Sequence, residues 1–94
     1  MIDEFEKEQE KKLISFLERK KVNFNKKLGE ISLECELTYT NFYDKRIDLK
    51  SIDEKMIRIH YSEELLVVTI EKETEIIAID SVIIYDNKKL MIRY

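Results

Sequence analysis

The chain contains no proline and no tryptophan, and among its 94 residues it has one glycine, one cysteine and one histidine. A lone cysteine, Cys35, excludes a disulfide framework within the chain and is typical of the reducing cytoplasm. One glycine, Gly29, is too few for the loops that cradle nucleotide phosphates. His60 has no second histidine or cysteine at ligand spacing. We therefore expect no cofactor and no bound metal.

Long apolar runs are missing as well. No window reaches the roughly 18 apolar residues that a membrane span needs, and the first six residues do not show the basic and then apolar order of a signal peptide. Acidic residues outnumber basic ones by 20 to 17, and 44% of the residues are hydrophobic, a composition that argues against disorder. We expect a single cytoplasmic domain over residues 1–94, without membrane contact.

The segment from residue 3 to about residue 22 is predicted to be helical. One stripe at helical spacing consists of Phe5, Gln9, Leu13, Phe16, Leu17 and Lys20. Asp3 and Glu6 have the spacing of a helix N-cap and its reciprocal partner. Acidic residues in the first half and basic residues in the second half complement the helix dipole.

From Glu30 onward the apolar period changes from helical to two, which predicts strands. The clearest alternation is Ile31, Leu33, Cys35, Leu37 and Tyr39. Further strands are predicted near residues 45–50, 55–61, 65–71, 75–85 and 88–94. The connections are too short for crossover helices, so neighbouring strands must be antiparallel. The predicted fold is α+β, with the N-terminal helix (about 3–22) packed on a five- to six-stranded, mostly meander sheet (about 30–94).

Two-residue turns at Ser62-Glu63, Glu73-Thr74 and Asp86-Asn87 would bring most of the aliphatic residues of the last strands to one face. Under this register the core face carries Ile57, Ile59, Tyr61, Leu66, Val68, Ile70, Ile77, Ile79, Ile83, Leu90 and Ile92. We expect the helix to pack on this face.

The opposite face is more apolar than a solvated antiparallel face normally is. It carries Met56, Arg58, His60, Leu65, Val67, Ala78, Asp80, Val82, Ile84, Met91 and Arg93, with Asp80 directly across from Arg93. An apolar centre with a charged rim is typical of a protein interface. The predicted partner-binding residues are Arg58, Leu65, Val67, Asp80, Val82, Ile84, Met91 and Arg93. The alternative is that the first strands cover this face as the sheet curls into a barrel or sandwich.

No catalytic residue is predicted. Cys35 lies on the alternating apolar stripe, where a small core residue needs no further explanation. His60 has no orienting carboxylate nearby in the predicted register, and the paired acids Glu34 and Glu36 lie on the polar side of their strand. No serine has a Gly-x-Ser-x-Gly context. We expect a protein that is not an enzyme.

A basic run over residues 11–27 holds seven lysines and arginines against Glu18 alone. Such a run can contact phosphates. The helix dipole already accounts for its position, and the whole chain has a net charge of −3. We do not expect nucleic-acid binding.

The function that these features favour is a small protein–protein interaction module. Self-association through the apolar face is its simplest form, because a two-fold axis lets one patch pair with itself in a homodimer. A more specific hypothesis is an inhibitor, encoded by a phage or mobile element, that binds a larger host enzyme such as a defence nuclease. It is based on the small size, the acidic strand surface, the missing catalytic motifs, and the use of 14 Ile and 13 Lys against 4 Arg, as in AT-rich genomes.

An alternative from another class is a small-ligand or nucleotide-binding protein. Arg58, His60 and Arg93 near Asp80 would hold an anionic metabolite on the sheet face or in a dimer cleft.

Overall fold

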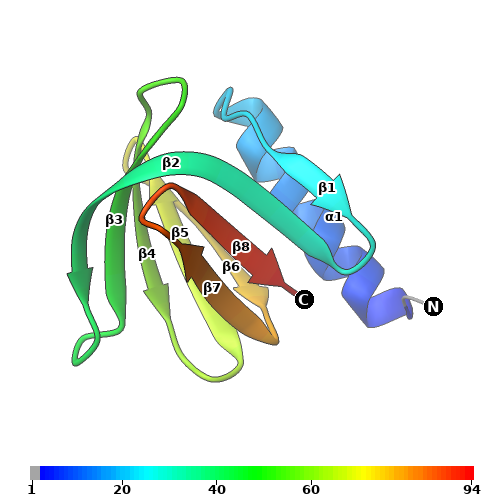
Figure 1. Ribbon diagram of the computed structural model, residues 1–94. Helices are drawn as coiled ribbons and strands as arrows, with labels where there is room; N and C mark the ends of the chain where they lie inside the picture. The colour runs from blue at the N-terminus through cyan, green and yellow to red at the C-terminus, as the bar shows by residue number, and fades with distance from the viewer. Residues whose placement is uncertain (1–2) are drawn as a thin grey trace.

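The computed structural model describes residues 3–94, which form one helix and eight strands (Figure 1). The elements are α1 (Glu4–Arg19), β1 (Asn25–Lys27), β2 (Glu30–Asn41), β3 (Arg46–Ser51), β4 (Met56–Tyr61), β5 (Leu65–Ile70), β6 (Glu73–Ala78), β7 (Ser81–Tyr85) and β8 (Lys89–Arg93). All strand pairs are antiparallel. The predicted α+β fold, a helix on a mostly meander sheet, is confirmed.

The number of strands exceeds the expected five to six for two reasons. The three-residue β1 pairs with β2 and carries no periodic signal of its own. The predicted strand over residues 75–85 is divided into β6 and β7, because the chain leaves one part of the sheet at Ile79 and enters another at Asp80. Two backbone hydrogen bonds mark this crossing, from Ile79 N to Glu64 O (3.0 Å) and from Asp80 N to Arg93 O (2.6 Å).

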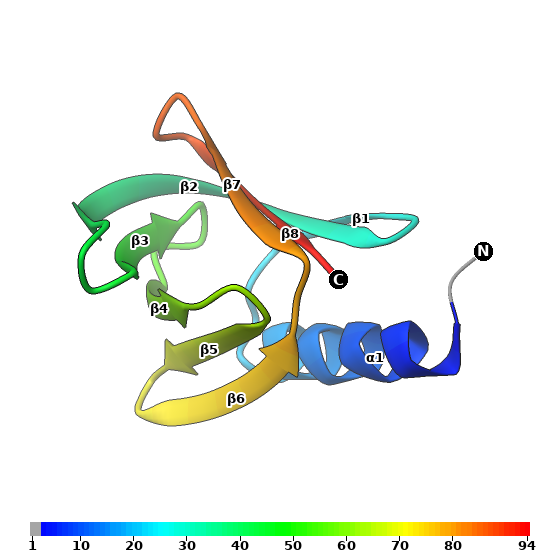
Figure 2. The same ribbon diagram turned by 90° about the horizontal axis from the view of Figure 1, so that it is seen from below.

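The sheet bends along β2 into two layers (Figure 2). The strand order is β6-β5-β4-β3-β2-β8-β7, with β1 beside β2. The first half of β2 pairs with β8, its second half pairs with β3, and the ladder shifts between Leu37 and Tyr39. We call β3 to β6 with the second half of β2 the β3–β6 layer, and β1, β7 and β8 with the first half of β2 the β7–β8 layer.

Helix α1 lies alongside β6 and covers the side on which the two layers diverge (Figure 2). Asp3 is the N-cap, and its Oδ1 accepts a hydrogen bond from Glu6 N at 2.8 Å. The buried helical residues are Gln9, Leu13, Phe16 and Leu17. Phe5 was expected in this stripe but is exposed, because the first turn of the helix extends beyond the end of β6. The helix ends at Arg19, before the expected residue 22, and Lys21 adopts a positive φ of 57°.

The core lies between the two layers and the helix. Its largest fully buried side chains are Phe16, Leu13, Leu17, Ile31, Leu33, Ile47, Leu49, Ile57, Ile59, Leu66, Ile70 and Ile77. At about 25 cal/mol per Å2 of apolar surface removed from water, this burial is the main source of stability.

Two of the three predicted turns give the expected faces, although the partners differ. Ile59 pairs with Val68, and Leu66 pairs with Ile77. The predicted turns would pair Ile59 with Leu66 and Ile77 with Ile70, so the observed partners are displaced by two and four residues. An even shift leaves every side chain on its face. The structure therefore places Ile57, Ile59, Leu66, Val68, Ile70 and Ile77 in the core, as expected.

The third turn is one residue longer than predicted, and this reverses the faces of β7. Ile84 pairs with Leu90, and Val82 pairs with Ile92. Asp86 and Asn87 adopt positive φ angles of 49° and 60°, and Lys88 N donates to Tyr85 O at 2.8 Å. Val82 and Ile84 consequently pack against the core, and Ile83 lies on the outer face, opposite to the prediction.

Candidate protein-binding surface

The eight predicted partner-binding residues do not form one surface. Arg58, Leu65 and Val67 lie on the outer face of the β3–β6 layer, as predicted. Val82 and Ile84 pack against the core because of the longer turn. Asp80, Met91 and Arg93 belong to the β7–β8 layer, which the bend along β2 separates from the other three.

Asp80 and Arg93 are neighbours through their backbones and not through their side chains. Ser81, not Asp80, is the residue opposite Arg93, and Asp80 N donates to Arg93 O. The guanidinium of Arg93 instead meets Glu30 across the β2–β8 ladder, with Nε 3.5 Å from Oε2. Met91 lies on the outer side of β8 between Ser32 and Ile83, and only 6% of it is exposed.

The outer face of the β3–β6 layer is formed by two cross-strand rows. One row runs Tyr39, Asp48, Arg58, Thr69 and Thr74, and the next runs Asn41, Arg46, His60, Val67 and Ile76. Leu65, next to the second row, is 48% exposed, and Ile76 is 51% exposed. The face thus has a polar, arginine-containing side on β3 and β4, and on β5 and β6 an apolar patch formed by Leu65, Val67 and Ile76.

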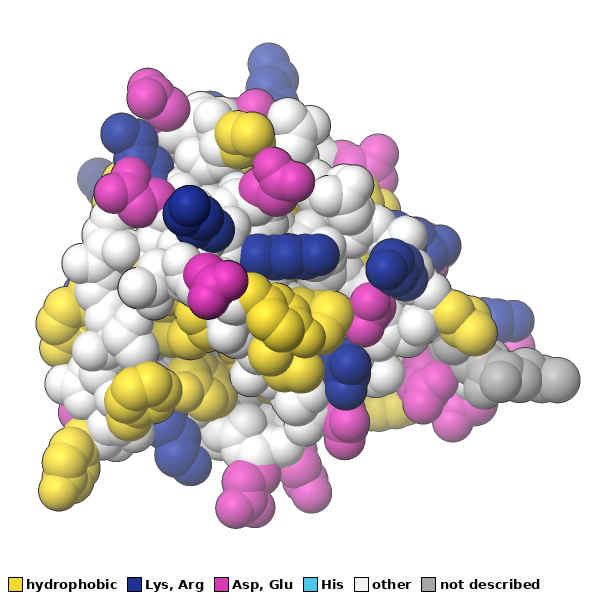
Figure 3. Space-filling model, in the orientation of Figure 1, with side chains coloured by type: hydrophobic (Ala, Val, Ile, Leu, Met, Phe, Trp, Pro, Cys, Tyr) yellow, Lys and Arg dark blue, Asp and Glu magenta, His cyan; other side chains and the backbone are white. Residues whose placement is uncertain are grey.

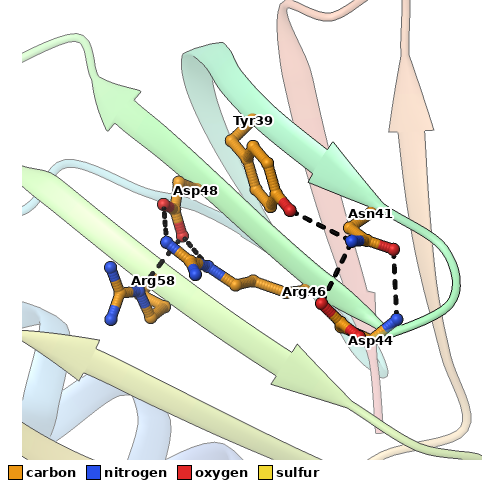
Figure 4. A network of polar contacts seen from close by, with 6 residues as sticks. All are labelled: Tyr39, Asn41, Asp44, Arg46, Asp48 and Arg58. Atoms are coloured by element: carbon orange, nitrogen blue, oxygen red, sulfur yellow. Dashed lines mark hydrogen bonds and ion pairs between the residues drawn. The ribbon is translucent and has the colours of Figure 1, made fainter.

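Asp48 organises the polar side (Figure 4). Arg46 donates from Nε to Oδ1 at 3.1 Å and from Nη2 to Oδ2 at 2.6 Å, and Arg58 Nε lies 3.3 Å from Oδ1. These hydrogen bonds and charges hold the pKa of the Asp48 carboxyl below its usual value, because they favour the ionised form. The Arg46 guanidinium also lies over the Tyr39 ring, 4.8 Å from its centre. Contacts within the chain therefore fix the positions of the Arg46, Asp48 and Arg58 side chains.

The hairpin between β2 and β3 presents two aromatic side chains to solvent. Asn41 Oδ1 accepts from the backbone N–H groups of Tyr43 (2.9 Å) and Asp44 (3.2 Å), and Asn41 Nδ2 lies 3.0 Å from both Asp44 Oδ2 and Tyr39 OH. Asparagine side chains stabilise tight turns in this way. Phe42 is 73% exposed and Tyr43 is fully exposed. We call residues 41–44 the hairpin tip; it lies next to the polar side of the outer face (Figure 4).

The residue pattern did not indicate the hairpin tip, because periodicity is informative for strands and not for the turns between them. A local signal was present. Asn41 and Asp44 flank two consecutive aromatic residues. An exposed turn of that composition places large apolar side chains in solvent, outside the core.

Cys35 and His60, the single cysteine and the single histidine of the chain, lie in different surroundings. Cys35 is half-buried, and burial raises the pKa of its thiol, which is the reverse of what a nucleophilic cysteine needs. His60 is exposed on β4. Within residues 3–94, no group of three or more His, Cys, Asp or Glu side chains is placed to hold a metal ion. Arg58 and His60 lie on a different layer from Asp80 and Arg93, so the four residues of the small-ligand alternative are not brought together.

No family model, curated protein or solved structure matches the chain. In the described part of the chain, the helix is neither long nor apolar enough to cross a bilayer.

Proposed function

We propose that this chain is a small, non-enzymatic protein-interaction module that binds a larger protein through the hairpin tip and the adjoining outer face of the β3–β6 layer. One observation carries the proposal: Phe42 and Tyr43 are exposed on a turn that hydrogen bonds hold rigid, beside the Tyr39–Arg46–Asp48–Arg58 network. Aromatic residues and arginine are the types that contribute most to binding energy at interfaces.

The rigidity of this surface supports binding because it lowers the entropic cost of association. Arg46 and Asp48, which their mutual hydrogen bonds already fix, lose little conformational freedom when a partner covers them. Arg58 is half-exposed and uses its Nε on Asp48, so its terminal nitrogens face solvent and suit a carboxylate of the partner. Leu65 and Ile76 extend the surface with apolar area at the other end.

We further propose that the partner is a larger enzyme that the chain inhibits, such as a defence nuclease of a host cell, and that a phage or mobile element encodes it. The support is the composition, rich in Ile and Lys and poor in Arg, together with the exposed aromatic side chains of the hairpin tip. The free thiol of Cys35 supports the reducing cytoplasm as the place of action.

The test is affinity capture on immobilised chain from a lysate of the native host, followed by measurement of the dissociation constant for the purified partner. A Phe42→Ala/Tyr43→Ala double variant should bind at least about 30-fold more weakly, the effect of losing about 2 kcal/mol at a hot spot. Neither side chain packs in the core, so the thermal midpoint should be unchanged.

Phe5→Ala is the matched control, because Phe5 is also an exposed aromatic residue but lies on α1, away from this surface. It should bind like the wild type. Equal retention of the partner by the double variant and the control would contradict the proposal. A large rise in thermal midpoint with nucleotides, without any captured protein, would favour the small-ligand alternative.

A further inference from the structure

Strand β7 ends the sheet without the features that normally protect an edge strand. It pairs with β8 on one side and stands last in the strand order. Its sequence, Ser-Val-Ile-Ile-Tyr, contains no charge and no proline, whereas edge strands are usually blocked by charged residues, proline or a covering element. Figure 2 shows no helix or strand lying over β7.

The opposite edge of the sheet, strand β6, is protected by charged residues and by a covering helix. β6 carries Glu73 and Glu75, and α1 runs beside it. Gln9 Oε1 accepts a hydrogen bond from Ala78 N at 2.8 Å, so the helix satisfies part of this edge. The contrast shows that β7 differs from an ordinary edge strand of this same sheet.

Both faces of β7 are apolar at the edge. Val82 and Ile84 point toward the core but remain half-buried, and Ile83 and Tyr85 lie on the outer face. Figure 3 shows hydrophobic side chains gathered over β7 and β8. A strand added beside β7 would cover these side chains and pair the unpaired backbone groups.

The charges at the two ends of β7 identify the added strand. Asp80 lies just before β7 and gives that end a negative charge. Asp86, Lys88 and Lys89 follow β7 and give the other end a net positive charge. Asp80, Lys88 and Lys89 make no ion pair within residues 3–94, while Arg93 is engaged by Glu30. In an antiparallel pair of identical strands, the acidic start of one strand meets the basic end of the other.

We propose that β7 pairs with β7 of a second copy of this chain, antiparallel about a two-fold axis, so that the β7–β8 layers of two copies form one continuous sheet. The arrangement is self-complementary, as a two-fold interface must be. It differs from self-association through a sheet face, and it leaves the hairpin tip of each copy free to bind a partner.

Sedimentation equilibrium of the whole chain tests the proposal. The wild type should have twice the mass of 11.4 kDa. Ile83→Lys places a charge on the outer side of β7 without touching the core, and it should weaken the dimer at least tenfold. Ile76→Lys is the matched control, because it makes the same change on the outer side of the other edge strand and should leave the dimer intact. Circular dichroism should show both variants folded.

A charge exchange tests the antiparallel orientation. Asp80→Lys alone, or Lys88→Glu with Lys89→Glu, should weaken the dimer, and the three changes together should restore it. A wild type that stays monomeric up to millimolar concentration would overturn the proposal. A dimer that Ile76→Lys disrupts and Ile83→Lys does not would also overturn it, and would place self-association on the β3–β6 layer. The first result leaves the expected effect of Phe42→Ala/Tyr43→Ala on partner binding unchanged, whereas the second would place a second copy on the face that we propose for the partner.

Discussion

Arg46 and Asp48 lie two residues apart on β3, on the same outer face, and form a two-pronged ion pair with hydrogen bonds of 3.1 and 2.6 Å. Alternation along a strand is what brings them together, since residues i and i+2 share a face. The pair orients Arg46 over Tyr39 and positions Asp48 for Arg58. A local sequence relationship thus sets the geometry of the proposed binding surface.

Asp48→Asn should make the protein less stable at neutral pH, by about 1 kcal/mol after allowance for the partial exposure of the arginines. The folded state lowers the pKa of Asp48. Its stabilisation is therefore present above the unfolded pKa of about 3.9 and is lost as the pH falls through the folded pKa. Urea midpoints of both proteins from neutral to strongly acidic pH should converge in acid. A constant difference at every pH would contradict this account.

Gln9→Leu should destabilise the fold by about 1–3 kcal/mol, the cost of leaving a buried donor unpaired. Gln9 is buried, and its Oε1 accepts from Ala78 N. Leucine keeps the apolar contacts of the helix but removes the acceptor. Denaturant titration measures the change, and Glu8→Leu, on the exposed side of α1, is the control. An unchanged midpoint for Gln9→Leu would show that the Ala78 N–H finds another acceptor.

Val82→Asp should destabilise the fold much more than Val67→Asp, although both valines were expected on the same face. Val82 packs against the core, so a carboxylate there should cost several kcal/mol, on the order of 3, or abolish folding. Val67 lies on the outer face, so the same change should cost less than about 1 kcal/mol and should weaken partner binding instead. Thermal midpoints check the first effect, and partner titration checks the second. Similar midpoints would mean that β7 has the register set by a two-residue turn at Asp86-Asn87.

Tyr94→Phe should lower the free energy of unfolding by about 1 kcal/mol, the usual worth of one hydrogen bond. Tyr94 OH donates to Glu10 Oε2 at 2.8 Å and so links the C-terminus of the sheet to α1, while Lys26 pairs with the other oxygen of Glu10. Burial and Glu10 raise the pKa of Tyr94, which keeps its hydroxyl protonated. Tyr85→Phe, on the exposed end of β7, should leave the urea midpoint unchanged. Equal midpoints for the two variants would mean that the Tyr94–Glu10 link contributes nothing.

Sequence patterns predicted the features that are set by residues close together in the sequence. The cap at Asp3, the buried helical stripe from Gln9 to Leu17, and the alternation of β2 up to Leu37 follow from side-chain periods along one element. Tyr39 was expected in the same stripe as Leu37 but lies on the outer face, because the β2–β3 ladder shifts between these two residues. The core face of β4, β5 and β6 was also predictable, because the turn errors were even and an even shift leaves the faces unchanged.

The proposed binding surface was only partly predictable. Arg58, Leu65 and Val67 were expected on one face and lie on one face. Phe42 and Tyr43 were missed because they lie in a turn, where no period exists. Val82 and Ile84 were misplaced because a single additional turn residue reverses a whole strand.

The sequence by itself determined the helix, the positions of most strands and most of the core, because a helical or alternating period acts over a few residues and needs no distant contact. The tertiary structure alone decided the bend along β2 and the crossing at Ile79 and Asp80. These features depend on how strands far apart in the chain meet around a shared core, and no local pattern encodes that meeting.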